Sequence, residues 1–237
     1  MNISSTNKNS VIIVADKPII NPSEIIPYEN LSVNYSVFLN TLLFSNWVEI
    51  LSAHSNNFEI ITLLNEKDKE YLPKYLLPHD TVTIFYSKAR LSDITEYLIM
   101  QVSSINSKNI ILFYNSIGLN QNEIIRIFNL IQTDEPSIAI GKSFKDKIVL
   151  TCTNSIDKDL INPLFTHNRK YSDYLKVISN KDFFIHALEG FFSVDDFEDI
   201  KKLYIELSKK ESLSYCSQKM HESFNDLFIE YKELLNV

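Results

Sequence analysis

The sequence predicts a three-layer α/β domain, in which a mostly parallel but mixed sheet lies between helices and is followed by C-terminal helices. Strand-like apolar runs alternate with helical apolar stripes over residues 10–135, as in βαβ units. Two further strand-like runs are joined by a short polar link, which is typical of antiparallel pairing. The chain has 237 residues, enough for one large domain or for one domain with an appendage.

The chain is expected to enter the sheet at Val11–Ala15, an apolar run that follows ten polar, disordered residues. Three prolines between Pro18 and Pro27 predict an irregular loop after this strand. From Val33 to Leu51 apolar residues cover most of a helical wheel, which predicts a helix buried over much of its circumference.

The alternation then repeats. Runs rich in β-branched and aromatic residues predict strands at 58–64, 81–86 and 109–114. A short charged helix is expected at 66–72. Apolar residues at three- and four-residue spacing predict a longer helix at 91–105.

After a loop at 115–119, Asn120 is expected to cap the next helix, because Glu123 stands three residues later, as in a capping box. Strands at 137–141 and 147–151 are then expected to form a hairpin or near-hairpin, which makes the sheet mixed.

From Pro163 on, the sequence predicts mainly helices. We therefore expect an α/β domain at residues 10–165 and a helical extension at residues 166–237 that packs on the same domain. Two apolar stripes mark the helices of this extension: Phe197, Ile200, Leu203, Tyr204 and Leu207, and Phe224, Leu227, Phe228, Tyr231 and Leu235.

The composition excludes several functional classes. With only 3 glycines, neither a GxGxxG fingerprint nor a phosphate-binding P-loop can be written. The chain carries 23 Lys and Arg against 30 Asp and Glu, a net charge of −7. Nucleic acid is therefore not an expected partner, because binding its phosphates needs a concentrated basic surface.

A cytoplasmic location is expected. Met1–Ser10 lacks the apolar core of a signal peptide. The longest uncharged stretch, Asn30–Val48, contains too many polar residues for a membrane span. Two cysteines, Cys152 and Cys216, suit a reducing compartment and form no zinc pattern.

Polar residues follow three of the predicted parallel strands. They are Asp16-Lys17, Ser87-Lys88 and Asn115-Ser116. In open α/β sheets ligands bind beyond the carboxyl ends of the strands. The sequence therefore predicts a binding site at these positions.

Three segments resemble the bacterial glycosyltransferase-A-like nucleotide-diphospho-sugar transferases. The first is the strand Val11–Ala15 with Asp16-Lys17-Pro18 after it, where the family has an apolar strand, a basic residue and a proline. The second is Ile110–Leu119, and the third is Pro136–Gly141 with the following Lys142–Leu150. The resemblance implies a Rossmann-like, glycosyltransferase-A-like fold and a nucleotide-diphospho-sugar transferase domain at residues 10–165.

The resemblance also implies a ligand and its contacts. A nucleotide-sugar would lie over the strand ends, with Lys17 on a phosphate. Asn115, Ser116 and Asp146 would lie near the sugar or near a Mg²⁺ or Mn²⁺ ion that neutralises the diphosphate. It assigns no catalytic residue and no metal ligand.

The chain departs from the family at these positions. The family's Ser-Asp pair is here Asn115-Ser116, and its Asp-Gly-Gly-Tyr turn is here Phe144–Lys147, with Asp146 as the one aspartate. The family's Lys-Thr-Arg-Leu element has no counterpart in Ile19–Leu31. A second hypothesis follows: the fold is retained as a non-catalytic scaffold or interaction module, with a protein partner or a second copy bound through the C-terminal helices.

Each candidate residue also has a structural explanation. Lys17 suits a solvated loop, Asn115 and Ser116 suit helix capping or loop hydrogen bonds, and Asp146 suits a tight turn. These alternatives stay open at the level of the sequence.

Overall fold

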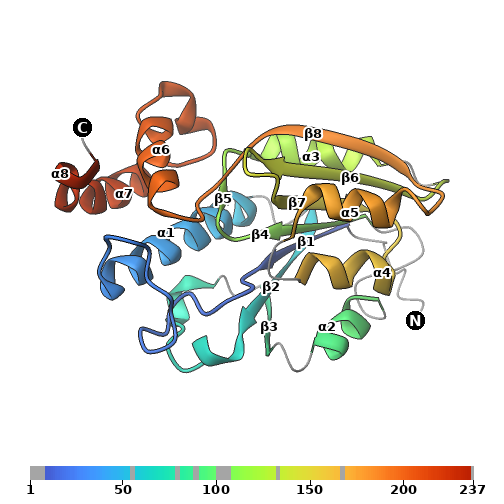
Figure 1. The fold of residues 1–237 in the computed structure, drawn as a ribbon, viewed down its shortest axis with the longest axis horizontal. Helices are drawn as coiled ribbons and strands as arrows, with labels where there is room; N and C mark the ends of the chain where they lie inside the picture. Colours follow the sequence, from blue (N-terminus) through green and yellow to red (C-terminus); the bar gives the residue numbers. More distant parts are fainter. Residues whose placement is uncertain are drawn as a thin grey trace.

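A computed structural model describes residues 9–53, 57–77, 81–87, 91–99, 108–131, 134–165 and 169–235. One sheet of eight strands lies between two layers of helices, in the strand order β3-β2-β1-β4-β7-β6-β8-β5 (Figure 1). The predicted three-layer α/β fold with a mixed, mostly parallel sheet is confirmed.

The sheet is parallel over β1 to β4 and becomes mixed beyond them. β7 is antiparallel to both of its neighbours, β4 and β6, while β8 is parallel to β6. The strands are β1 (Asn9–Val14), β2 (Phe58–Asn65), β3 (Val82–Tyr86), β4 (Asn109–Phe113), β5 (Ser116–Ile117), β6 (Ser137–Ser143), β7 (Ile148–Thr153) and β8 (Phe184–Ser193).

Helices connect the strands and form the C-terminal part. The α-helices are α1 (Val33–Ser52), α2 (Leu91–Tyr97), α3 (Gln121–Leu130), α4 (Lys158–Ile161), α5 (Tyr171–Ile178), α6 (Phe197–Leu207), α7 (Gln218–Glu230) and α8 (Lys232–Leu235). Four short 3₁₀ helices among the described residues are η1 (Glu66–Asp68), η2 (Lys74–Leu76), η5 (Asn162–Phe165) and η6 (Lys210–Ser214).

Both faces of the central strand β1 are buried, because its side chains alternate between two apolar cores. Val11 and Ile13 belong to the core that also contains side chains of α1, α3, α6 and α7. Ile12 and Val14 belong to the core on the other face, with side chains of α2, α4 and α5. Strands buried on both faces are continuous apolar runs, which explains why β1 was recognisable in the sequence.

The capping box predicted for α3 is present. The backbone N–H of Asn120 donates to Oε2 of Glu123 at 2.8 Å, and the N–H of Glu123 donates to Oδ1 of Asn120 at 3.1 Å. These two bonds satisfy donors that the first helical turn leaves without partners. They fix where the chain turns after β5.

Two predicted helices differ from the structure or reach beyond it. The charged helix predicted at 66–72 is a single 3₁₀ turn, η1, and the carboxylate of its last residue, Asp68, binds the loop after β1. The second half of the helix predicted at 91–105 and the N-terminal residues 1–8 lie outside the described residues.

The main correction concerns residues 184–193, which fall in the range predicted as helical. They form the ten-residue strand β8, which pairs with β6 from Ser137 opposite Phe184 to Ser143 opposite Phe191. Without β8, this edge of β6 would leave its backbone N–H and C=O groups without strand partners. The loop predicted at 115–119 likewise contains β5, which pairs with the end of β8. The division of the chain at residue 165 stays a prediction.

The loop after β1 is held by one buried carboxylate. Asp68 accepts hydrogen bonds from three consecutive backbone N–H groups, those of Ile19, Ile20 and Asn21, at 2.9 to 3.0 Å. Its side chain is fully buried. The side chain of Asn21 adds a bond from Nδ2 to the carbonyl oxygen of Lys67 at 2.9 Å. The irregular loop predicted at 18–27 is thus fixed against η1.

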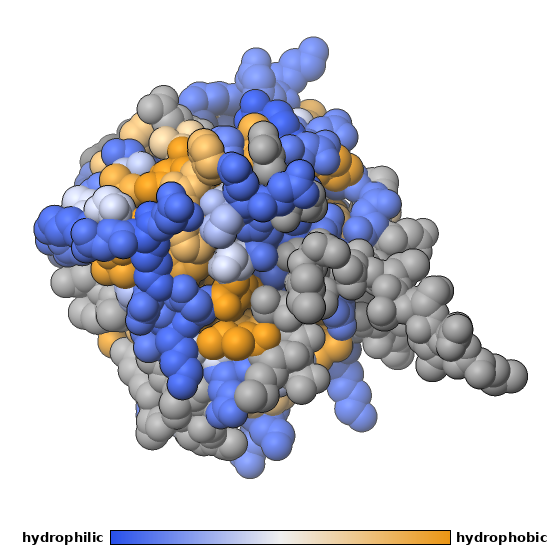
Figure 2. Space-filling model, turned by 90° about the vertical axis from the view of Figure 1, so that its right-hand side faces the viewer, coloured by the Kyte–Doolittle hydropathy of each residue, from blue (hydrophilic) through white to orange (hydrophobic). Residues whose placement is uncertain are grey.

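The end of the sheet at which the parallel strands begin faces the viewer in Figure 2. Apolar side chains gather there in separate patches between hydrophilic ones. In the part of the chain that the structure describes, no helix combines the length and the apolar character needed to cross a membrane.

Replacing Asp68 by alanine is expected to lower the free energy of unfolding by about 3 kcal/mol, because three buried N–H groups lose a charged acceptor. Urea denaturation followed by circular dichroism measures this. The matched control is Asp226→Ala at an exposed position of α7, which should stay within about 0.5 kcal/mol of the wild type. Equal stabilities of the two variants would contradict the role given to Asp68.

Candidate functional site

The sheet changes its direction of growth between β1 and β4. From β1 the chain adds β2 and β3 on one side, whereas β4 lies on the other side of β1. At such a switch point the connections that follow the two neighbouring strands run in opposite directions. Open α/β sheets bind ligands in the crevice that this leaves beyond the carboxyl ends of the strands. Lys17 follows β1 and Asn115 follows β4, so two of the predicted site residues lie at this point.

Five charged side chains from four segments of the chain surround this point, and we call them the charged cluster: Asp16, Lys17, Lys147, Arg169 and Asp195. Nζ of Lys147 lies 2.8 Å from Oδ1 of Asp195, and Nη1 of Arg169 lies 3.7 Å from Oδ2 of Asp16. Three cations thus face two carboxylates. The cluster carries a net positive charge in a chain whose total charge is negative.

Arg169 is the most deeply buried member of the cluster, with 5% of its side chain exposed. The centre of its guanidinium group lies 3.6 Å from the ring centroid of Phe113, the last residue of β4. Its backbone φ of 33° lies in the left-handed region, which costs a non-glycine residue conformational energy. Nη1 has no hydrogen-bond partner in the described structure.

Lys17 forms no ion pair among the described residues. Its Nζ atom lies 5.4 Å from the ring centroid of Tyr28. Burial lowers the pKa of Lys17 below its usual value, although the carboxylates of Asp16 and Asp195 act in the opposite direction. An anion that enters the site would stabilise the charged form of a lysine in this position.

Asp195 lies beside Asn115 and is held by three donors. Its Oδ1 accepts from Nζ of Lys147 and from Nδ2 of Asn115 at 3.2 Å, and its Oδ2 accepts from Oγ of Ser193 at 2.8 Å. Burial raises the pKa of Asp195, but Lys147 outweighs this effect and holds the pKa below its ordinary value. The remaining polar atom of the Asn115 side chain, Oδ1, is buried and has no hydrogen-bond partner among the residues that the structure describes.

The other two predicted site residues bind within the protein. Oγ of Ser116 donates to the carbonyl oxygen of Phe113 at 2.7 Å, and the Ser116 carbonyl accepts from Nε1 of Trp47 at 2.6 Å. Asp146 adopts a φ of 59° in the β6–β7 turn and accepts from Oγ of Ser172 at 2.8 Å, at the start of α5. Of the third strand end, Ser87 is described and Lys88 lies outside the described residues.

Three members of the charged cluster, Lys147, Arg169 and Asp195, were not predicted from the sequence as site residues. Lys147 is the first residue of the strand predicted at 147–151, and Asp195 belongs to the acidic pair before the helix that begins at Phe197. Arg169 follows a stretch of sequence that has no helical or strand-like pattern of apolar residues, so its position could not be predicted. Nothing local indicates that Asp195 meets a residue 80 positions earlier in the chain.

Neither cysteine is a nucleophile. Cys152 and Cys216 are both free and buried. Burial raises the pKa of Cys216 to about 12 and raises that of Cys152 as well, so both thiols are protonated at neutral pH.

The donor set of the cluster does not fit a resident Mg²⁺ or Mn²⁺ ion. No group of three or more His, Cys, Asp or Glu side chains suited to a metal occurs among the described residues. The two carboxylates of the cluster each face a cation instead, Asp195 facing Lys147 and Asp16 facing Arg169. Positive charge at this point is supplied by side chains of the protein.

No family model matches the sequence, and no curated protein matches it. Solved structures do match its fold. A candidate nucleotide-diphospho-sugar transferase from Desulfovibrio desulfuricans G20 matches over 96% of each chain, with 12% identity and a TM-score of 0.71. The 4-diphosphocytidyl-2C-methyl-D-erythritol synthase of Anaerococcus prevotii matches 86% of this chain and 100% of its own length, at 14% identity and a TM-score of 0.52.

A nucleotidyl transferase from Methanothermobacter matches 84% of this chain and 97% of its own length, at 11% identity and a TM-score of 0.51. At such identities the likeness concerns the fold. The chain has the Rossmann-like, glycosyltransferase-A-like fold that the sequence resemblance implied.

The ion pair of Asp195 with Lys147 makes the free energy of unfolding depend on pH. Its folded pKa lies below the unfolded value near 3.8, so the unfolded state binds more protons as the pH falls. The stability from this group is therefore present above pH 3.8 and is lost as the pH falls through the folded pKa. We expect Asp195→Asn to lower the free energy of unfolding by about 2 kcal/mol at pH 6.

This difference should shrink as the pH falls below 3.8, and urea denaturation from pH 6 to pH 3 measures it. Asp226→Asn, a loss of one exposed carboxylate, is the control. A constant difference between Asp195→Asn and the wild type over the whole range would contradict the assigned pairing.

Proposed function

We propose that this chain is a transferase that binds a nucleoside-diphosphate sugar beyond the carboxyl ends of β1 and β4. The diphosphate would lie against the three cations of the charged cluster. The fold supports this proposal, because several solved transferases of nucleotides share it. At the identities involved, the fold alone does not carry the function, so the proposal depends on the chemistry of the site.

The observation that carries the proposal is the set of incompletely paired polar groups at the switch point. Lys17 lacks an ion pair among the described residues, and a buried donor, Nη1 of Arg169, lacks a hydrogen-bond partner. The nearby Oδ1 of Asn115 is a buried acceptor that no donor of the described part of the chain reaches. Leaving such groups unpaired costs about 1–3 kcal/mol each, which a ligand of matching polarity recovers.

A diphosphate sugar matches these groups. Lys17 offers a compact charge with three donors to one phosphate, whereas the planar guanidinium of Arg169 suits two oxygens of a phosphate. Oδ1 of Asn115 can accept a hydrogen bond from a sugar hydroxyl. Since the three cations of the charged cluster would neutralise the diphosphate, we expect it to bind without a divalent ion.

Calorimetric titration tests this with uridine and guanosine diphosphates and their sugar derivatives, in the presence of Mn²⁺ and in the presence of EDTA. We expect one nucleotide series to bind in EDTA, and Lys17→Ala to weaken this binding about tenfold. The matched control is Lys201→Ala, because Nζ of Lys201 also lies 5.4 Å from an aromatic centroid, that of Phe197 in α6. This control should bind like the wild type.

Two results would overturn parts of the proposal. Binding that requires Mn²⁺ would refute the neutralisation of phosphate by the charged cluster. Baseline heat over the whole panel from folded protein would refute nucleotide binding and favour the non-catalytic scaffold.

A further inference from the structure

Apart from the charged cluster, the structure contains a pocket on the face of the sheet, beside α3. A pocket of about 680 Å³ opens between α3 and β8. Its volume falls within the range of ~300–1,000 Å³ that is typical of small-molecule sites. None of the five members of the charged cluster lines it.

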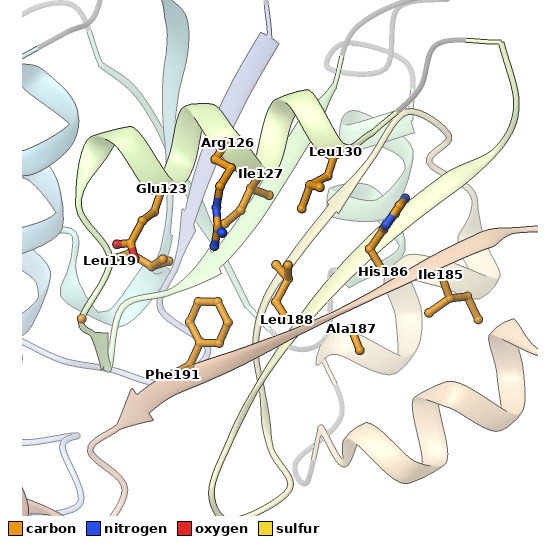
Figure 3. A pocket seen from close by; sticks show the side chains of 11 residues that line it. Leu119, Glu123, Arg126, Ile127, Leu130, Ile185, His186, Ala187, Leu188 and Phe191 are labelled. Carbon is orange, nitrogen blue, oxygen red and sulfur yellow. The ribbon is translucent and has the colours of Figure 1, made fainter.

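Side chains from both elements converge on this pocket. Figure 3 shows Arg126, Ile127 and Leu130 reaching from α3 toward β8, and Leu188 and Phe191 reaching from β8 toward α3. The walls contributed by Ile127, Leu188 and Phe191 are buried and apolar.

A register shift in the sheet builds the β8 wall. Gly141 of β6 lies opposite Leu188, and Ser143 lies opposite Phe191, so β8 contains one residue more than β6 between these pairs. The extra residue brings Phe191 to the same face as Leu188. Gly141 leaves the room for this ring, since a Cβ atom at this position would lie 2.7 Å from Cε2 of Phe191.

Arg126 brings a positive charge to the pocket, and this charge is not paired directly with a carboxylate of the described residues. Neither a hydrogen bond nor an ion pair engages its guanidinium group in the described part of the chain. One carboxylate oxygen of the nearby Glu123, Oε2, accepts a hydrogen bond from the N–H of Asn120 in the capping box, and this carboxylate lies at the Leu119 end of the pocket (Figure 3). The imidazole of His186 adds a second polar group on the β8 side.

We propose that this pocket binds a small amphipathic anion. Its carboxylate or phosphate group pairs with Arg126, and its apolar body lies between Ile127 and Leu188. Two parallel N–H···O bonds from a guanidinium group to such a head group are strong and directional. The apolar walls add the hydrophobic contribution that a free inorganic anion could not use.

Calorimetry on the full chain tests the proposal with four probes that share one alkyl chain, each below its micelle concentration. They are octanoate, octyl phosphate, 1-octanol and octyltrimethylammonium. We expect the two anions to bind and the cation not to bind, and the relative affinity of the anions distinguishes a carboxylate ligand from a phosphate ligand. Arg126→Gln should weaken anion binding about tenfold.

Two further variants separate the pocket from its surroundings. Leu130→Glu brings a negative charge to the half-buried rim and should abolish anion binding. Lys219→Gln removes the same charge as Arg126→Gln from an exposed position of α7 and should leave binding unchanged. The His186 ring resonances in a proton NMR spectrum should shift on binding in the wild type.

The proposal fails if octyltrimethylammonium binds as tightly as octanoate, or if folded Arg126→Gln binds octanoate like the wild type. It fails equally if none of the four probes binds. Octanoate binding should persist in Lys17→Ala, because the pocket does not depend on the charged cluster. A negative result here therefore leaves the nucleotide proposal standing, and the reverse also holds.

Discussion

The arrangement of the carboxyl edge depends on the carboxylate of Asp68. A loop with three prolines has few ways to satisfy its own backbone donors, and here one buried side chain satisfies three of them in succession. This fixes the path of the chain just after Lys17 and leads it to Tyr28, whose ring lies under the lysine ammonium. The hydroxyl of Tyr28 then bonds to Asn40 of α1 at 2.9 Å, which ties the loop to the first helix. The position of the site lysine thus follows from an acid in a different connection of the sheet.

Patterns within a few residues predicted most of the fold. β1, β2 and β4 are largely apolar runs because both of their faces are buried, and the start of α3 was predicted from Asn120 and Glu123. β8 could not be found in this way. Its apolar and polar residues do not alternate regularly, and its pairing with β6 shifts register after Gly141. It forms a strand because the edge of β6 is free to pair with it. Tertiary pairing overrides local preference at such positions.

The candidate site was predicted only in part, because local patterns locate some of its residues and tertiary structure alone brings in the others. Lys17 and Asn115 follow strands that are obvious in the sequence, so their place at the carboxyl edge could be inferred. Asp195 and Arg169 reach the edge through connections of no regular pattern. The Ser-Asp pair of the nucleotide-diphospho-sugar transferases that the sequence resembles is Asn115-Ser116 here, yet the space beside Asn115 holds the carboxylate of Asp195. An acid is therefore present next to this position, supplied by another segment and bound to a lysine.

β8 is synthesised well after β6, the strand with which it pairs, and this delay affects the nascent chain. The outer edge of β6 is complete when Ser143 has been added, but its partner begins only at Phe184. At synthesis rates of ~5–20 residues per second, this interval lasts roughly 2–10 seconds. During this time the nascent chain presents an apolar, open strand of the kind that pairs with other chains. The edge of β6 is therefore open to pairing with other chains until the last strand, β8, closes the sheet.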